Sequence, residues 1–376
     1  MRTRWMMLVA ATTLALSGAL AGMAPAASAN DGHNGRHDRH RDQSVVWPGQ
    51  SIQAAIDAAQ PGDTIIVRPG VYHGSLEIAT NGIHLIGFHA VIVPAATPGG
   101  SLCNQGNDPP TETGICVHGQ VDDATGDVIQ TVDNVVVAGF RVNGFSGDGT
   151  FVYGGHNFTA FNDEFSHNGG YGIFAFHSEY DNYIGNLSHD NGDAGLYVGE
   201  SPKANVVIEH NVSWRNTGEG LLFRDAVGGH VSGNSFTGNC MGVLALNDGA
   251  AGPGPFGNVR ITDNWIVANN NACPGEDQGP PPRSGLGLGI AGDSNVVVRH
   301  NVINNNVPGG PTGLPSGGIA VIDSTPFGGS APKNNTIVGN YLHGNVDNDI
   351  FSDGSGTGNV FKFNRCNTSD PAGLCA

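Results

Sequence analysis

A column of polar residues recurs at the ends of four repeated segments, and its residue types are those used in acid–base chemistry. Aligning the segments places in this column His177, Glu200, Asp225 and Asn247. Arg224 stands immediately before one member of the column, and Asp248 immediately follows another. Imidazole and carboxyl groups can exchange protons with a substrate, and a nearby cation can neutralise its negative charge. The column therefore predicts a proton-transfer site for an acidic substrate.

Aromatic residues precede this column on the same predicted strands. Phe174, Phe176 and Tyr197 occupy alternate positions that point outward, while the aliphatic residues between them point inward. Aromatic rings can pack on the apolar C–H faces of sugars, and the amide of Asn247 can bond to sugar hydroxyls. These four residues are the predicted substrate-binding set of a saccharide groove. The competing interpretation is that inserted loops cover the aromatic residues and that the charged residues form ordinary surface ion pairs.

Elimination or C5 epimerisation of a uronic acid is the first reaction class that fits these residues. A cation neutralises the sugar carboxylate while a base removes the adjacent proton. The cation could be Arg224, or a Ca²⁺ ion bound by the oxygen ligands Glu200, Asp225 and Asp248. The candidate bases are Arg224, Lys203, His177 and His230, of which the lysine and the second histidine are placed in the turns after the column.

Glycoside hydrolysis and binding without turnover remain open beside elimination. Hydrolysis uses two carboxyl groups, about 5–5.5 Å apart in retaining enzymes and about 6.5–9.5 Å apart in inverting ones. Glu200 with Asp225 on neighbouring repeats suits the shorter separation, and Glu200 with Asp248 suits the longer one. A protein that binds without turnover would be a carbohydrate-binding or cell-wall structural module.

The repeat that positions these residues is clearest between residues 157 and 248. Its first column has members 23, 25 and 23 residues apart, namely Asp163, Asn186, Asn211 and Asn234. Five residues later comes a second column, formed by Asn168, Asn191, Asn216 and Asn239. Repeats of this length indicate stacked coils, each too small to bury a core alone. Successive strands then lie about 4.8 Å apart, so a column becomes a ladder, for which an amide that donates and accepts hydrogen bonds is well suited.

This pattern resembles the right-handed parallel β-helix repeats of the pectin-lyase-like family. Residues 45–72, VVWPGQSIQAAIDAAQPGDTIIVRPGVY, are similar to the first segment of many secreted members. In this segment Ser51 can cap a short helix that ends at Pro61-Gly62 and covers the first strand edge. The predicted fold is all-β: a single-stranded right-handed parallel β-helix with a short N-terminal capping helix, forming one domain over residues 45–376.

The resemblance implies a polysaccharide partner without indicating a subfamily. The Asn-Thr-Asp set of galacturonases, the Asp-Pro-His-Asp of alginate epimerases and the Arg-x-Pro-x-x-Arg of classical pectate lyases are all absent. We therefore predict a protein that acts on or binds extracellular polysaccharide containing uronic acid, with elimination or epimerisation ahead of hydrolysis. A periplasmic accessory role, like that of β-helix proteins in copper-enzyme maturation, is disfavoured by the scarcity of Met and of clustered Cys.

The N-terminal segment has the pattern of a secretory signal peptide. Residues 1–29 contain a basic start, an apolar stretch and Ala27-Ser28-Ala29, which predicts cleavage after Ala29 and a secreted protein. Residues 30–44 are polar and rich in histidine, so we expect a disordered leader, with metal binding as the alternative.

Charge and hydropathy exclude two classes of partner. The formal net charge is −17, and loss of the two arginines of the leader takes it to −19, which disfavours nucleic acid. No segment after the leader is long and apolar enough to span a bilayer, so we expect no membrane insertion. We also expect a monomer or a weak oligomer.

All six cysteines lie in the predicted exported portion, an even number that suits disulfides in an oxidising compartment. The nearest pairings in the sequence are Cys103 with Cys116, Cys240 with Cys273, and Cys366 with Cys375.

Overall fold

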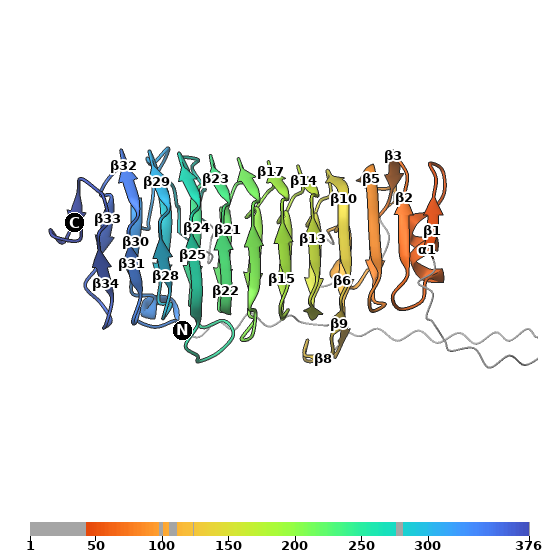
Figure 1. Ribbon diagram of the computed structural model, residues 1–376, viewed down its shortest axis with the longest axis horizontal. Helices are drawn as coiled ribbons and strands as arrows, with labels where there is room; N and C mark the ends of the chain where they lie inside the picture. Colours follow the sequence, from red (N-terminus) through yellow and green to blue (C-terminus); the bar gives the residue numbers. More distant parts are fainter. Residues whose placement is uncertain (1–42, 98–100, 105–110, 123, 276–280, 376) are drawn as a thin grey trace, which may run out of the picture.

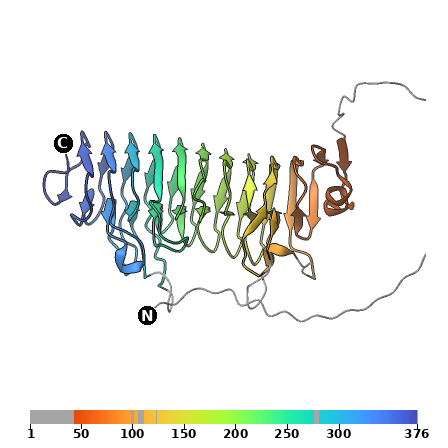
Figure 2. The same ribbon diagram turned by 90° about the horizontal axis from the view of Figure 1, so that it is seen from below.

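The computed structural model describes residues 43–97, 101–104, 111–122, 124–275 and 281–375. The predicted signal peptide and nearly all of the predicted leader lie outside these residues. The described chain winds into a row of coils with their strands side by side, from α1 at one end to the C-terminus at the other (Figure 1). Turning the molecule by 90° shows the same single row (Figure 2). In this part of the chain, no helix is long and apolar enough to cross a membrane.

Each central coil contributes one strand to a parallel sheet, called sheet B, that runs the length of the row. Its strands are β4 (Leu76–Ile78), β6 (Ile115–His118), β11 (Thr150–Tyr153), β15 (Ile173–Phe176), β18 (Leu196–Gly199), β21 (Glu219–Arg224), β24 (Met241–Leu246), β27 (Leu286–Ala291), β30 (Gly317–Ile322), β33 (Ile350–Ser352) and β35 (Ser369–Asp370). All strands run the same way, so sheet B has one edge where strands begin and one where they end. We call these its N-terminal and C-terminal edges.

The other two strands of each coil belong to sheet A, which bends at the first Asn column. The first row contains β13 (Thr159–Phe161), β16 (Asn182–Ile184), β19 (Val206–Glu209), β22 (Val227–Ser232), β25 (Gly257–Thr262), β28 (Val297–Arg299), β31 (Thr336–Val338) and β34 (Val360–Lys362). The second row contains β14 (Glu164–Ser166), β17 (Leu187–His189), β20 (Val212–Trp214), β23 (Ser235–Thr237), β26 (Trp265–Val267), β29 (Val302–Asn304) and β32 (Tyr341–His343).

The early coils differ from this plan. The strands β5 (His84–Val93) and β10 (Val136–Asn143) continue through the bend, and they pair with β2 (Thr64–Val67), β3 (Gly70–His73) and their neighbours. The first strand is β1 (Gln43–Val46), which begins inside the segment predicted as leader. An excursion between the early coils carries η1 (Leu102–Asn104), β7 (Gln120–Val121) and β8 (Val128–Gln130), followed by β9 (Val132–Asp133), which pairs with β12 (Gly155–His156). A second short 3-10 helix, η2 (Thr325–Phe327), lies in a late loop.

The capping helix forms where the sequence predicts it. α1 spans Ile52–Ala58, and the hydroxyl of Ser51 accepts a hydrogen bond from the backbone N–H of Ala54. Ile52 and Ile56 lie on one face of this helix and are buried against the first strands. The helix therefore packs against the core at the N-terminal end of the row.

The core is a continuous file of aliphatic and aromatic side chains inside the coils. Register in sheet B is regular, because Ile173 pairs with Leu196, Leu196 with Leu221 and Leu221 with Val243. All four side chains are buried, as the alternation in the sequence predicts.

Buried amides form the two predicted ladders at the corners of the coils. In the first, Asn186 Nδ2 donates to Asn211 Oδ1 at 3.0 Å, and Asn211 Nδ2 donates to Asn234 Oδ1 at 3.0 Å. The second column repeats this contact from Asn191 to Asn216. Asp163 begins the first ladder, and its two oxygens accept backbone N–H groups of Phe140 and Phe161. Burial raises the pKa of this carboxyl group well above its usual range, and the backbone N–H bonds oppose that shift.

Three disulfides link the cysteines that lie nearest in the sequence, joining Cys103 to Cys116, Cys240 to Cys273, and Cys366 to Cys375. The first ties the early excursion to β6, the second ties a long loop to the corner before β24, and the third fastens the last described segment. Such crosslinks persist in oxidising compartments.

Candidate functional site

The outer face of sheet B carries a continuous cluster of aromatic rings, which we call the aromatic face: Phe151, Tyr153, Tyr171, Phe174, Phe176 and Tyr197. Phe174 lies at its centre, with ring centroids 4.5 Å from Phe151, 4.7 Å from Tyr171 and 4.6 Å from Tyr197. Phe176 extends it toward His177, whose ring centroid is 4.2 Å away. The rings of Phe174, Phe176 and Tyr197, which the sequence predicts to point outward, therefore pack within one cluster on the outer side of sheet B.

Tyr197 fits into this face because Gly199 has no side chain. A Cβ at this glycine would lie 2.1 Å from the Tyr197 hydroxyl, so the ring rests over a position without a side chain. Tyr197 is 2% exposed, while Phe174 and Phe176 are half-buried. The two phenylalanines are thus the more accessible members of the predicted binding set.

Register brings the predicted polar column together at the C-terminal edge. The backbone N–H of His177 donates to the carbonyl of Gly199. In the same way, the N–H of Glu200 donates to the carbonyl of Arg224, and the N–H of Asn247 donates to the carbonyl of Ala291. Successive members therefore lie on successive coils, as the repeat predicts.

Arg224 is the main cation of this edge and is already paired. Its guanidinium contacts both carboxylate oxygens of Asp248, at 3.1 and 3.0 Å from Nε, with Nη2 2.9 Å from Oδ2. It also donates to the hydroxyl of Tyr197. The side chain is 31% exposed, so it remains partly accessible from solvent.

Glu200 and His177 flank this pair with altered acidities. Burial raises the pKa of Glu200, and the charge of Arg224 partly opposes this shift. Burial lowers the pKa of His177, which favours the neutral imidazole. Both residues are half-buried, so both remain accessible for proton transfer.

Asp225 is committed to backbone contacts instead of facing solvent. It is fully buried, and its carboxylate accepts N–H groups of Asp248 and Gly249 at 3.1 and 3.3 Å and of Ala251 at 2.9 Å. These bonds fix the start of the loop after β24. Asn247, 2% exposed, likewise binds Ser330 of a later loop. Their predicted roles in catalysis and substrate binding are not favoured by these positions.

The predicted calcium ligands do not form a metal centre as they stand. Asp225 is occupied by backbone N–H groups and Asp248 by Arg224. Among the described residues, no group of three or more His, Cys, Asp or Glu side chains is placed to hold a metal ion. A calcium site of Glu200, Asp225 and Asp248 would require both existing sets of contacts to break.

Two candidate bases lie away from the aromatic face. His230 belongs to β22 of sheet A, not to a turn, and its Nε2 is 3.8 Å from Glu209. Lys203 is on a turn, 70% exposed, with Nζ 3.7 Å from Glu179. Neither residue is brought to Arg224, so the site is reduced to the residues of sheet B and its edge.

A second set of charged residues, not anticipated from the sequence, lines the N-terminal edge of sheet B. We call Asp148, Asp193 and Glu219 the acidic edge. Glu219 is 2% exposed, and its Oε1 is 2.8 Å from Arg283 Nε, while its Oε2 is buried without a hydrogen-bond partner. Burial raises the pKa of Asp193 to about 6, and the charge of Glu219 adds to this shift.

Tyr171 connects the acidic edge to the aromatic face. Its backbone N–H donates to Asp148 Oδ1 at 2.8 Å, and its hydroxyl donates to Asp193. The ring stacks on Phe174. Burial raises the pKa of Asp148 to about 7, opposed by the Tyr171 N–H bond. In the sequence, an acidic residue stands one or two positions before Gly149, Gly195 and Gly220, but none precedes Gly172 on the coil between the first two. Arg283 comes from a distant loop that no spacing reveals.

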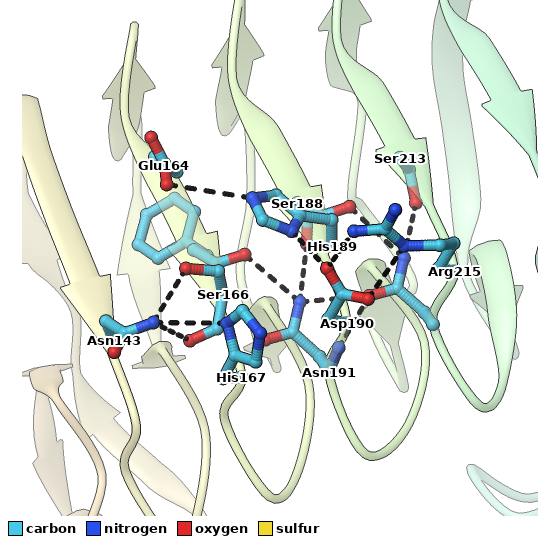
Figure 3. A network of polar contacts seen from close by, with 12 residues as sticks. Asn143, Glu164, Ser166, His167, Ser188, His189, Asp190, Asn191, Ser213 and Arg215 are labelled. Atoms are coloured by element: carbon cyan, nitrogen blue, oxygen red, sulfur yellow. Dashed lines mark hydrogen bonds and ion pairs between the residues drawn. The ribbon is translucent and has the colours of Figure 1, made fainter.

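A polar network also covers the outer side of β14, β17 and β20 in sheet A (Figure 3). His189 stacks on Trp214 with centroids 3.9 Å apart, and its Nδ1 is 2.6 Å from Asp190. Arg215 donates to the same carboxylate through Nε and Nη2, and Glu164 Oε1 lies 3.6 Å from His189 Nε2. Its charges are satisfied within the network, which is therefore best understood as a surface ion-pair chain.

Two surface hollows also lie on sheet A instead of beside the aromatic face. One, of about 360 Å³, is lined by residues including Gly62, Gly82 and Asn134; the other, of about 300 Å³, includes Gly139 and Gly185. Both hollows lie where glycines at the corners of the coils have no side chain to fill the space. Neither hollow coincides with the aromatic face of sheet B, so the saccharide groove expected there stays a prediction.

Comparison with known proteins identifies the fold of this molecule. Residues 111–266 match the family described as right handed beta helix region, and the described chain forms the parallel stacked sheets of that fold. The chain therefore has the right-handed parallel β-helix fold. Among the curated proteins, none matches it in sequence.

Solved structures with this fold include several proteins named for action on polysaccharides. The A-module of the mannuronan C-5 epimerase AlgE4 of Azotobacter vinelandii is 17% identical, covers 84% of this chain and 90% of its own, and has a TM-score of 0.54. The pectate lyase Pel9A is 17% identical, with coverage of 86% and 79% and a TM-score of 0.53. The Dettilon tailspike protein is 14% identical, with coverage of 87% and 68% and a TM-score of 0.53. At these identities the likeness establishes the fold alone.

Proposed function

We propose that this protein is exported and that it binds, and acts on, an extracellular uronic-acid-containing polysaccharide along the aromatic face of sheet B. The observation that carries this proposal is the contact series through Phe174, which links rings on three successive coils and ends in charged groups at both edges. Phe151 and Phe174 are half-buried on neighbouring coils and offer stacking positions one coil apart to a polymer with repeated sugar rings. Disulfides and a signal-like leader support export.

Arg224 is the residue that favours an acidic polymer over a neutral one. A uronate carboxylate can share the guanidinium with Asp248, because Arg offers donors in a fork that suits paired oxygens. Glu200, with its raised pKa, lies on the neighbouring coil and could exchange a proton there. Elimination or epimerisation at this edge stays a prediction, as does the alternative of a module that binds without turnover.

Binding tests this proposal through two substitutions on the face. Phe174→Ala should weaken binding to polygalacturonate or alginate roughly tenfold, about 1.4 kcal/mol, because the central ring of the face is lost. Arg224→Ala should weaken binding to these polymers but leave any binding to a neutral xylan unchanged. Affinity electrophoresis or calorimetry measures both effects.

Arg141→Ala is the matched control, since Arg141 is also ion-paired, with Glu164 at 3.0 Å, but lies on sheet A. It should change binding by less than about twofold. The stability cost of Arg224→Ala should be about 1 kcal/mol, because the pair it breaks is partly exposed. Equal binding by wild type, Phe174→Ala and Arg224→Ala would rule out this face as the glycan site.

A further inference from the structure

Positive charge is gathered on the last coils of sheet A, although the chain as a whole is strongly acidic. Residues 257–268, 294–305, 333–344 and 357–365 carry five cationic side chains and one carboxylate, a local formal charge of +4 in a chain of −17. Their strands, from β25 and β26 to β34, lie side by side at the C-terminal end of the row (Figure 1). The five cations are Arg260, Arg299, Lys333, Lys362 and Arg365.

These five cations differ from the other cations of the described chain in having no carboxylate partner among the described residues. Ion pairs with carboxylates are formed instead by Arg141, Lys203, Arg215, Arg224 and Arg283. Arg68 is the remaining cation, and it lies over the ring of Trp47 at the N-terminal end of the row. All five unpaired cations are exposed, so their charge is available to a ligand.

The register of sheet A places exposed aromatic rings in the same region. Trp265 on β26 aligns with Val302 on β29, which aligns with Tyr341 on β32. Tyr341 aligns in turn with Arg365 on the next coil. Trp265 is 53% exposed and Tyr341 is 40% exposed. The two rings therefore belong to one outward column, with their backbones two strand spacings apart, about 9.5 Å.

Two further cations stand on the other side of the bend in sheet A. Arg299 ends β28 and Lys362 ends β34, and both align with Val338, which ends β31 between them. Arg299 comes three residues before Val302, and Lys362 comes three residues before Arg365. From coil to coil, a ring, a cation, a ring and two cations thus follow one another. We call Trp265, Arg299, Tyr341, Lys362 and Arg365 the basic corner.

Contacts within the basic corner leave its charge exposed. The guanidinium carbon of Arg365 lies 5.3 Å from the centre of the Tyr341 ring, a cation–π contact. Arg299 Nε donates to His300 Nε2 at 3.1 Å. His300 Nδ1 faces the single carboxylate of the region, with 3.8 Å to Asp263 Oδ1. Neighbouring rings therefore position these two guanidinium groups, and no carboxylate of the described chain neutralises them.

We propose that the basic corner is a second polysaccharide-binding site, which takes an anionic chain with uronate rings on Trp265 and Tyr341. Carboxylates of the chain pair with the cations of the coils between and beyond these rings, because guanidinium groups suit carboxylate oxygens. Charge complementarity selects such a ligand, since exposed cations without partners attract a polyanion. A linear polymer also fits the single line in which rings and cations alternate, whereas a lipid surface would meet that line only along one edge.

This site goes beyond the proposed function because it lies on another sheet and on other coils. The aromatic face occupies β11, β15 and β18 of sheet B, and the basic corner begins at β26 of sheet A. One molecule therefore offers two separate surfaces to polysaccharide, and each can be removed without the other.

Calorimetric titration with polygalacturonate, in a background of Phe174→Ala and Arg224→Ala, isolates the basic corner from the aromatic face. Adding Arg299→Ala and Lys362→Ala together should weaken the remaining binding about tenfold. Adding Trp265→Ala instead should weaken it about fivefold. Raising the ionic strength from about 0.01 M to about 1 M shortens the Debye length from about 30 Å to about 3 Å and should remove most of it. Fully methyl-esterified polygalacturonate has the same backbone without the charge, so it should not bind at the corner.

Arg141→Ala and Leu187→Ala are the matched controls. Arg141 is an exposed cation of sheet A on β10, and Leu187 on β17 is an exposed apolar residue in the column of Trp265. Each should change binding by less than about twofold. Because all of the side chains replaced at the corner and in the controls are exposed, the variants should fold, and melting curves check this.

Each outcome separates this inference from the proposed function. Unchanged binding in the corner variants would overturn the inference, as would equal binding of the methyl-esterified polymer. No binding in the Phe174→Ala, Arg224→Ala background would also overturn it and leave the aromatic face as the site. Binding that depends on the corner and not on Phe174 would support it and remove the proposed face. If vesicles of phosphatidylcholine and phosphatidylglycerol bind at the corner and polygalacturonate does not, the ligand is a lipid surface and the inference is wrong.

Discussion

Replacing Asn211 with alanine is expected to lower the free energy of unfolding by about 3–5 kcal/mol. The side chain is 1% exposed and lies in the middle of the first ladder. Its Oδ1 accepts the backbone N–H and the amide of Asn186, and its Nδ2 donates to the carbonyl of Tyr183 and to Asn234. Truncation leaves these groups buried without partners, and each such group costs about 1–3 kcal/mol. Chemical denaturation measures the loss.

Asn271→Ala is the matched control, because Asn271 follows the second ladder on an exposed turn. Its stability should change by no more than about 0.5 kcal/mol. Asn211→Asp is a second comparison. Aspartate keeps the oxygen that accepts from Asn186, but its other oxygen faces the Tyr183 carbonyl, which is also an acceptor. If the Asn211→Ala variant is as stable as wild type, the ladder hydrogen bonds do not contribute to the free energy of unfolding.

Stability is expected to fall as the pH rises from 5 to 8. Burial raises the pKa of Asp181 to about 8, of Asp148 to about 7 and of Asp193 to about 6, and raises that of Asp293 well above its usual range. In the unfolded chain these carboxyls titrate near 4. The folded protein therefore holds protons that the unfolded chain has released, so their stabilising effect is complete below pH 4 and disappears as pH rises through the folded values.

Asp181 should dominate the resolved part of this loss. It is 2% exposed, and its Oδ1 accepts the backbone N–H of Phe158 while its Oδ2 is buried without a partner. Its ionisation should cost on the order of 3–5 kcal/mol by pH 8. Thermal melting across the pH series measures the trend.

Asp181→Asn isolates this contribution, because asparagine keeps the acceptor oxygen and does not ionise. The variant should match wild type near pH 5 and melt at a higher temperature at pH 8. Asp57→Asn, on the surface of α1, should follow wild type throughout. A wild-type melting temperature that climbs between pH 5 and 8 would contradict the proposed role of these buried acids.

The fold followed from the sequence because its determinants are periodic. Asn186 and Asn211 mark a corner on every coil, and alternation in strands such as β15 and β18 fixes which side chains face the core. Ser51 before an apolar helical stripe predicted the cap for an equally local reason. Each of these features repeats, or lies within a few residues of its partner.

The candidate site was only partly predictable. The repeat placed Glu200 and Arg224 on adjacent coils, but nothing in it showed that the loop after β24 would wrap its backbone around Asp225. The ion pair between Glu219 and Arg283 joins residues 64 apart through an inserted loop. Insertions follow no period, so the repeat does not reveal the contacts they make.

The corner amides have one more consequence for how this molecule can vary. Ladder partners are separated by 23 residues between Asn211 and Asn234 but by 39 between Asn301 and Asn340, and the Nδ2–Oδ1 distance is 3.0 Å in both. The amide hydrogen bond therefore does not depend on the number of residues inserted between successive coils. Such a scaffold can acquire new peptide at its corners, by natural drift or by grafting, without any rung having to move.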